Sequence, residues 1–352
     1  MRLRDLGVSV GRLDVGKGNA ITDVEGVSVG QVEIGAGGLH SGLTAVVPYP
    51  TDVGARRLFI GRYALDGGDV LTGLGVVEDF GTFSTPIVLA PRASIGRVYD
   101  ALIQYGLGRD PGLSTTTGWP PMVVGVDDTY INPAVETYRH VVEAHVAQAL
   151  KGRSSGAVRE GNVGIGAGLC AFDLKGGVGT SSRRVEVEGT EYTVGVLVAA
   201  NAGAAAGLCI DRYPLDLKVD AGAAQRPRTF VAVVATDAPL IPRQLDRLAG
   251  RTSLGLTRVG LIDAATHEGV VLAFSTRAPL LEEGEVVEQV QSVDENLLSP
   301  FFGAAAEAAE EAVLNALLAA EPLVVRDISL AVLPRQGWLE RLRRHQESGG
   351  DE

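Results

Sequence analysis

The stretch AAQRPRTFVAVVATDAPL, residues 223–240, joins a loop of small and charged residues to an unbroken apolar run from Phe230 to Ala235. Continuous apolar runs of this length are typical of strands that are buried on both faces. Thr229 is the last polar residue before the run, and it can simply be a β-branched residue that opens a strand. Alternatively, cleavage of the Arg228–Thr229 bond would make Thr229 a chain terminus, with its hydroxyl beside a free α-amino group.

A threonine at a chain terminus combines a nucleophile and a general base in one residue. Its α-amino group has an ordinary pKa of about 7.7–8.0, so it is partly neutral at pH 7 and can accept the hydroxyl proton. N-terminal threonine is a recognised variant of the nucleophile–base arrangement of hydrolases. The first position of a buried strand also holds the nucleophile on a rigid element, as a preorganised site requires.

Composition favours one compact α/β domain over residues 1–352, since 45% of the 352 residues are apolar, 46 are glycine and no linker is visible. A net charge of −12 without a basic block argues against nucleic acid as a partner. The N-terminus lacks the apolar core of a signal peptide, and the longest apolar run, residues 192–210, has Asn201 at its middle. We therefore expect a buried strand there, and no membrane partner. Cys170 and Cys209 lie in apolar surroundings, which indicates a reducing, cytoplasmic location.

The pattern of apolar residues predicts strands and helices in mixture. Short apolar runs bounded by Gly and Pro predict six buried strands, over residues 43–48, 85–90, 121–126, 193–200, 230–236 and 269–276. Helices are expected over 132–152, with Asn132 as N-cap and Pro133 behind it, over 240–256 and over 299–322. The loop 211–228 matches neither pattern and leads to Thr229. This mixture implies sheets covered by helices, a layered α/β or α+β fold.

Three further segments hold candidate chemistry. Asn201 follows a buried strand, where its amide either caps a turn or stabilises an oxyanion. The segment 160–182 is the richest in glycine, but it matches neither a P-loop nor a dinucleotide fingerprint, and we expect close backbone packing or a substrate channel there. Lys175 in this segment would need a partner or a lowered pKa if buried. The spacing of His, Cys and Asp predicts no metal site, and no cofactor is expected.

Long ordered motifs across the chain resemble the DmpA-type family of self-processing aminopeptidases, which includes L-aminopeptidase/D-amidase-esterases and β-peptidyl aminopeptidases. These motifs are RDLGVSVG, NAITDVEGVSVGQ, GLTAVVP, EGNVGIGAGLCAFDLKGGVGTSSR, YTVGVLVAAN, VVATDAPLIPRQLDRLAGR, LAFST and EAAEEAVLNALLAAE. The resemblance implies a four-layer αββα sandwich, as in ornithine acetyltransferases, and self-cleavage into an α-chain of residues 1–228 and a β-chain of 229–352. Family members usually begin the β-chain with Ser and precede it with a small or amide residue, where this chain has Thr229 and Arg228.

The resemblance also assigns roles to particular residues. Asn201 matches the oxyanion donor, and Tyr130 and Asn132 in DDTYIN match residues that line the substrate pocket. Apart from the resemblance, Lys175 in the glycine-rich segment 160–182 is kept as a candidate supporting residue. Homotetramers of processed protomers are expected by the same resemblance.

The family's Ser-Gly-acid motif, which orients the nucleophile, falls at THEG, residues 266–269. Thr266 and Glu268 match it if one residue is deleted nearby, whereas an ungapped alignment places His267 and Gly269 there. We favour Thr266 and Glu268, because a hydroxyl and a carboxylate can accept hydrogen bonds from the free ammonium of Thr229. His267 is kept as the alternative.

The favoured function is an N-terminal-nucleophile hydrolase that releases N-terminal residues from small peptides, amides or esters through an acyl-enzyme on Thr229. One alternative keeps the acyl-enzyme but transfers the acyl group to an amine, as ornithine acetyltransferases do. An endo-acting hydrolase of oligoamides is intermediate between the two. A third alternative is an unprocessed, non-catalytic binding protein in which Thr229 only opens a strand.

Overall fold

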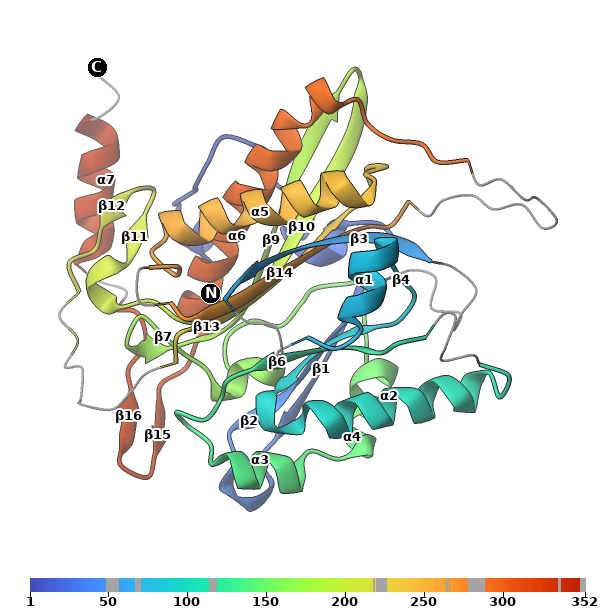
Figure 1. Cartoon of the computed structure of the whole chain (residues 1–352). Coiled ribbons are helices and arrows are strands. Elements are labelled where there is room, and N and C mark those ends of the chain that lie inside the picture. The colour runs from blue at the N-terminus through green and yellow to red at the C-terminus, as the bar shows by residue number, and fades with distance from the viewer. Residues whose placement is uncertain are drawn as a thin grey trace.

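Two β-sheets lie face to face in the computed structural model, and helices cover the outer face of each sheet (Figure 1). The structure describes residues 1–48, 57–66, 71–113, 119–217, 219, 227–263, 266–277, 289–334 and 337–348. The four layers are therefore helix, sheet, sheet and helix, which confirms the predicted αββα sandwich.

The smaller sheet has four strands in the order β1-β2-β5-β6. Its strands are β1 (Ser28–Ile34), β2 (Ser41–Val47), β5 (Ile87–Pro91) and β6 (Met122–Val126). Helices α2 (Ile95–Arg109) and α4 (Glu143–Lys151) cover its outer face, where Val98, Leu102, Val146 and Leu150 pack into one apolar cluster with the strands. Strands β5 and β6 are parallel, so both end at the same edge of the sheet.

The larger sheet has six strands in the order β4-β3-β14-β13-β10-β9. These are β4 (Thr82–Phe83), β3 (Leu58–Leu65), β14 (Glu268–Ser275), β13 (Thr229–Thr236), β10 (Thr190–Asn201) and β9 (Gly177–Val187). Helices α5 (Pro242–Arg258) and α6 (Ser299–Ala319) cover its outer face (Figure 1). Between the two sheets lies a second core that includes Leu197, Val231, Val233 and Leu272. Because both faces of the central strands are covered, their sequences are continuously apolar.

Shorter elements complete the described chain. They are helices α1 (Leu74–Phe80), α3 (Ala134–His140) and α7 (Trp338–Ser348), and strands β7 (Cys170–Ala171), β8 (Leu174–Lys175), β11 (Cys209–Ile210), β12 (Tyr213–Pro214), β15 (Leu323–Val325) and β16 (Ile328–Leu330). The hairpin β15–β16 projects from the sandwich at the lower left of Figure 1. Within the described residues no helix has the length and apolarity to cross a membrane.

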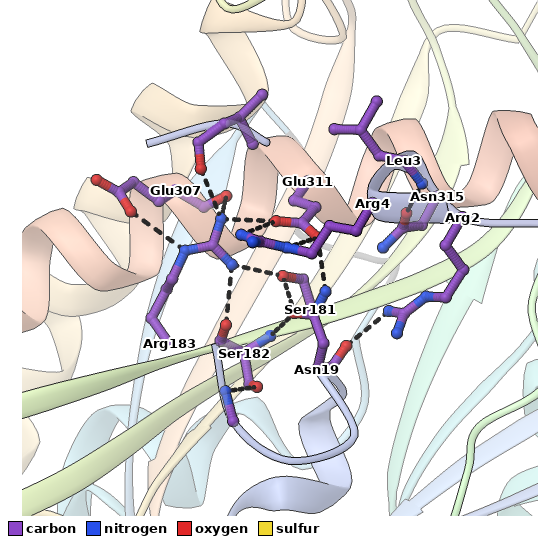
Figure 2. Close-up of polar contacts among 12 residues, drawn as sticks. Arg2, Leu3, Arg4, Asn19, Ser181, Ser182, Arg183, Glu307, Glu311 and Asn315 are labelled. Atoms are coloured by element: carbon purple, nitrogen blue, oxygen red, sulfur yellow. Dashed lines mark hydrogen bonds and ion pairs between the residues drawn. The ribbon is translucent and has the colours of Figure 1, made fainter. Parts of the chain in front are cut away.

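A buried network of charges ties the N-terminal segment to β9 and α6 (Figure 2). Arg183, on β9, pairs with Glu311 at 2.8 Å and with Glu307 at 3.1 Å, both on α6. Arg4 also pairs with Glu311, at 2.9 Å, and Asn19 donates to the same carboxylate at 2.6 Å. Burial acts to raise the pKa of Glu311, but the hydrogen bond from Arg4 and the charge of Arg183 outweigh it, so the pKa is lowered. Removing one member of such a network leaves a buried charge without compensation.

All six predicted strands are present, but the single helix predicted over residues 132–152 is wrong. Two helices occur instead, because the backbone leaves the helical region at Val141 (φ −77°, ψ 116°) and Val142 (φ −130°, ψ 162°). The break turns the β-branched Val141 into the core, where it is fully buried. The position before α3 is Pro133, so Asn132 does not cap a helix. The predicted loop 211–228 contains β12, and its residues 218 and 220–226 lie outside the described residues.

Candidate active site

Three adjacent strands of the larger sheet bring Asn201, Thr229 and Glu268 into one row. Asn201 ends β10, Thr229 begins β13 and Glu268 begins β14. In the strand registers Asn201 lies opposite Thr229, and Thr229 lies opposite Glu268. Side chains at paired positions lie on the same face of a sheet, and this face points toward the smaller sheet. The row therefore lies between the sheets, at the edge where these three strands begin or end.

The side-chain amide of Asn201 is held in one orientation. It is fully buried, and its Oδ1 accepts from the backbone N–H of Cys170 at 3.1 Å. Its Nδ2 donates to the carbonyl of Asp127 at 2.6 Å and to Thr229 Oγ1 at 3.1 Å. The Oδ1 acceptor and one N–H of Nδ2 are both held by backbone groups, so the remaining N–H is aimed at the oxygen of Thr229. The amide is thus held rigidly beside the Thr229 hydroxyl, and its role as an oxyanion donor stays a prediction.

The carbonyl group immediately before Thr229 is also held by hydrogen bonds. The Arg228 oxygen accepts from the backbone N–H of His267 at 2.9 Å and from that of Glu268 at 3.4 Å. The Thr229 side chain is 8% exposed, at the start of a strand that is otherwise fully covered. The hydrogen-bonded carbonyl of Arg228 therefore lies directly before the buried hydroxyl of Thr229 in the chain.

The smaller sheet contributes a cation to the site. Arg92 follows the end of β5, and its guanidinium pairs with the carboxylate of Glu268. Its Nε is buried and has no hydrogen-bond partner among the described residues. Asp127, whose carbonyl holds Asn201, directly follows the parallel strand β6. Arg92 was not predicted from the sequence, although its place just after a buried strand was visible there.

The two residues assigned to the substrate pocket have different surroundings. Asn132 is buried, and its amide exchanges two hydrogen bonds of 2.9 Å with the backbone of His40 and donates to Asp128 at 2.9 Å. These bonds fix the turn after β6. Tyr130 is partly buried against the small apolar cluster that includes Leu330 of the β15–β16 hairpin. Contact of Tyr130 and Asn132 with substrate stays a prediction.

Asp128, in the turn after β6, is a buried carboxylic acid that accepts from Ser41 and Asn132. Burial is the main cause that raises its pKa, to about 6, although hydrogen bonds from Ser41 and Asn132 act in the opposite direction.

The two alignments of the THEG motif differ in whether Glu268 or Gly269 takes the acidic position, and Gly269 has no side chain that could act as an acid. A side chain at position 269 has no room, since a Cβ built there would lie 2.0 Å from Phe230 Cε1. His267 is exposed, and it contacts the site through its backbone N–H. The Thr266 hydroxyl bonds to Asp263 within the described residues. Participation of Thr266, His267 or Glu268 in catalysis stays a prediction.

Lys175 is buried. The sequence predicts that a buried lysine here has hydrogen-bond partners or a lowered pKa, and Lys175 has both. Its ammonium donates to the carbonyls of Gly166, Leu169 and Gly176 at 2.8, 2.9 and 2.8 Å. Burial lowers its pKa to about 7. In the part of the chain that the structure describes, no cluster of three or more His, Cys, Asp or Glu side chains could hold a metal ion.

The chain is similar to a known peptidase family and to proteins of known structure. The sequence model of peptidase family S58 matches residues 19–330. The β-peptidyl aminopeptidase BapA of Sphingosinicella microcystinivorans is 34% identical over 92% of this chain and 86% of its own. The crystal structure of the PH0078 protein from Pyrococcus horikoshii matches with a TM-score of 0.90 and 35% identity, covering 98% of this chain and 99% of that one. The L-aminopeptidase D-Ala-esterase/amidase of Ochrobactrum anthropi, a variant of the N-terminal-nucleophile hydrolase fold, matches with a TM-score of 0.85 and 32% identity over 99% of both chains.

These matches confirm the predicted resemblance to DmpA-type enzymes, and they agree with the αββα layers and with a hydrolytic function. The chain therefore belongs to peptidase family S58 and has the fold of the N-terminal-nucleophile hydrolases.

Proposed function

We propose that this protein is an aminopeptidase that cleaves its own Arg228–Thr229 bond and then uses Thr229 as its nucleophile. The observation that carries the proposal is the contact of Asn201 Nδ2 with Thr229 Oγ1, 3.1 Å apart, beside an Arg228 carbonyl that accepts two backbone hydrogen bonds. A threonine that only opened a strand would not need the contact with Asn201, whereas the two backbone hydrogen bonds also continue the parallel pairing of β13 with β14.

Self-cleavage would begin with attack of Thr229 Oγ on the carbonyl carbon of Arg228. The C–N bond to Thr229 breaks as an ester forms on Oγ, and the nitrogen takes up the proton that Oγ loses and leaves as the free α-amine. The N–H groups of His267 and Glu268 would stabilise the negative oxygen of this step, because they already bind it in the ground state. Water then hydrolyses the ester, which gives a new carboxylate on Arg228 and a free hydroxyl on Thr229.

In turnover the α-amine of Thr229 takes the proton from Oγ as Oγ attacks the substrate carbonyl. Asn201 Nδ2 donates to the developing oxyanion, and the leaving amine receives the proton. Glu268 lies beside Thr229 in the register, so its carboxylate would accept a hydrogen bond from the new ammonium. The Arg92 guanidinium, which pairs with this carboxylate, would keep it in place. Water then releases the acyl group from Oγ.

Small peptides, amides or esters with a free N-terminal residue are the proposed substrates. This class is supported by the relatives, which are described as a β-peptidyl aminopeptidase and as an L-aminopeptidase D-Ala-esterase/amidase. A cytoplasmic location is supported by two free cysteines, and assembly as a homotetramer by the family resemblance. Light scattering of the purified protein tests the assembly.

The function is tested with the variants Thr229→Ala and Thr229→Ser. Thr229→Ala should remain one chain on a denaturing gel and hydrolyse none of a panel of α- and β-aminoacyl p-nitroanilides. Thr229→Ser keeps the hydroxyl and should yield two chains. Thr190→Ala is the matched control, because Thr190 also begins a strand but is exposed. Cleavage of the Thr229→Ala chain would contradict the proposal.

A further inference from the structure

Lys175 is a buried cation for which the proposed mechanism has no use. Its side chain is fully buried, and every hydrogen bond of its ammonium that the structure gives is to a backbone carbonyl. An ammonium has three N–H donors, and three carbonyls accept them, so the hydrogen bonds satisfy the charged form even though burial lowers the pKa of Lys175 to about 7. Burying a charge costs free energy unless it is well hydrogen-bonded. A buried lysine with this arrangement therefore requires a reason.

The hairpin that carries Lys175 has a bulky residue in the left-handed conformation. Strands β7 and β8 form a two-residue hairpin in which Cys170 lies opposite Lys175. Both turn residues, Phe172 (φ 53°) and Asp173 (φ 63°), are left-handed, as a type I′ turn requires. A bulky residue such as phenylalanine rarely adopts this conformation. Strain of this kind clusters at functional sites.

One peptide unit connects Lys175 to the candidate oxyanion donor. The carbonyl oxygen of Leu169 accepts from Lys175 Nζ at 2.9 Å. The N–H of the same peptide unit belongs to Cys170, and it donates to Asn201 Oδ1 at 3.1 Å. Asn201 Nδ2 then donates to Thr229 Oγ1 at 3.1 Å. The ammonium is thus joined to the reacting oxygen by a chain of three hydrogen bonds, each pointing the same way.

Hydrogen bonds in such a chain polarise one another. The positive charge of the Lys175 ammonium, beside the Leu169 carbonyl oxygen, draws electrons toward that oxygen and makes the Cys170 N–H a stronger donor. That donor in turn polarises the Asn201 carbonyl, which makes Nδ2–H a stronger donor to an oxyanion. The carbonyls of Gly166 and Gly176 hold the ammonium in place from its other sides. Glycine at position 176 lets the backbone that follows Lys175 pass close to β10, because a Cβ there would lie 2.4 Å from the oxygen of Ala200, the residue before Asn201.

We infer that Lys175 is a positioning residue that orients and polarises the Asn201 amide through the peptide unit between Leu169 and Cys170. This inference rests on the proposed function, because it assigns Lys175 a part in stabilising the oxyanion that forms on the substrate carbonyl when Thr229 Oγ attacks it. It also explains why a lysine rather than an apolar side chain fills this place in the core.

The test is a double-mutant cycle between Lys175→Met and Asn201→Ala, measured as kcat and KM on aminoacyl p-nitroanilides. Methionine is unbranched and of similar length, but it removes the charge and the donors. Lys175→Met should lower kcat about ten-fold, a part of the about 10²–10³ that one oxyanion donor contributes, and leave KM within about two-fold. In the Asn201→Ala background the same substitution should have no further effect on kcat. Lys151→Met, at an exposed position of α4, is the matched control and should match wild type.

Lys175→Gln is the second variant. It keeps N–H donors without the charge, and it tests the inference if Lys175→Met does not fold. An unchanged kcat in a folded variant would overturn the inference. An equal loss of kcat in both backgrounds would overturn it too, since a structural role does not depend on Asn201. If circular dichroism shows that neither variant folds, Lys175 acts on the fold and the inference is wrong. Wild-type protein without activity on the whole panel would overturn the proposed function as well, whereas an active Lys175→Met overturns this inference alone.

Discussion

The substitution Asn201→Asp separates the role of the Asn201 amide in catalysis from its role in packing. The new side chain has the same shape and keeps the acceptor for Cys170 N–H, but it loses the N–H donors to Thr229 Oγ1 and to the Asp127 carbonyl. Loss of one oxyanion donor should lower kcat by about 10²–10³, or about 2.7–4 kcal/mol, with KM nearly unchanged. The part-buried Asp127 carbonyl loses its donor and a carboxyl group replaces a fully buried amide, so the free energy of unfolding should fall by at least about 1–3 kcal/mol.

Two assays measure these effects on one preparation. Hydrolysis of aminoacyl p-nitroanilides gives kcat and KM, and urea unfolding gives the loss of stability. Self-cleavage should be affected less than turnover, because the Arg228 carbonyl is held by the N–H groups of His267 and Glu268. Asn296→Asp, at an exposed position, is the control and should leave kcat unchanged. A folded, processed Asn201→Asp variant with kcat within about three-fold of wild type would refute the role of Asn201 as oxyanion donor.

Three further substitutions test other parts of the account. Arg92→Met removes the cation from Glu268 and should lower kcat/KM about five-fold, since a partly exposed ion pair contributes up to about 1 kcal/mol. Gly269→Ala forces a Cβ against the Phe230 ring, and overpacking of this kind should cost about 1–3 kcal/mol, seen as a lower melting temperature. Glu311→Gln should destabilise the protein by about 3 kcal/mol at pH 7, measured by urea unfolding. Because the folded-state pKa of Glu311 is lowered, its contribution is present above its usual value of 4.5 and is lost as the pH falls through the folded pKa, so the variant should lose less stability on acidification.

Each of these substitutions has a control of the same type. Arg139→Met removes a surface ion pair, Gly303→Ala adds a Cβ with no atom within 4 Å, and Glu340→Gln changes an exposed carboxylate. None of the three should have a measurable cost. Unchanged kcat/KM for Arg92→Met, an unchanged melting temperature for Gly269→Ala, or acid unfolding of Glu311→Gln that parallels wild type would contradict the corresponding interpretation.

The buried strands and the positions of Asn201 and Thr229 at their ends could be predicted from the sequence because they depend on local pattern, whereas the four layers followed from the family resemblance. Strands that are buried on both faces have continuous apolar sequences, and such runs predicted β10 and β13. Asn201 and Thr229 stood out as polar residues at the ends of such runs. Their registration across the two strands places them in contact.

The rest of the site depends on contacts between distant segments. Arg92 and Glu268 are 176 positions apart, and no local spacing indicates that the two sheets bring them together. The connection from Lys175 to Asn201 could not be predicted for the same reason, because it runs through two hydrogen bonds of the Leu169–Cys170 peptide unit and not through a side chain. The helix predicted through Val141 and Val142 failed because burial of Val141 in the core outweighed the helical pattern.

The most direct test of the central claim is the mass of the freshly purified protein under denaturing conditions, with N-terminal sequencing of each fragment. The account predicts two chains, residues 1–228 and 229–352, the smaller beginning Thr-Phe-Val-Ala. A single intact chain that remains intact on long incubation would contradict it, and Thr229 would then be only the residue that opens β13.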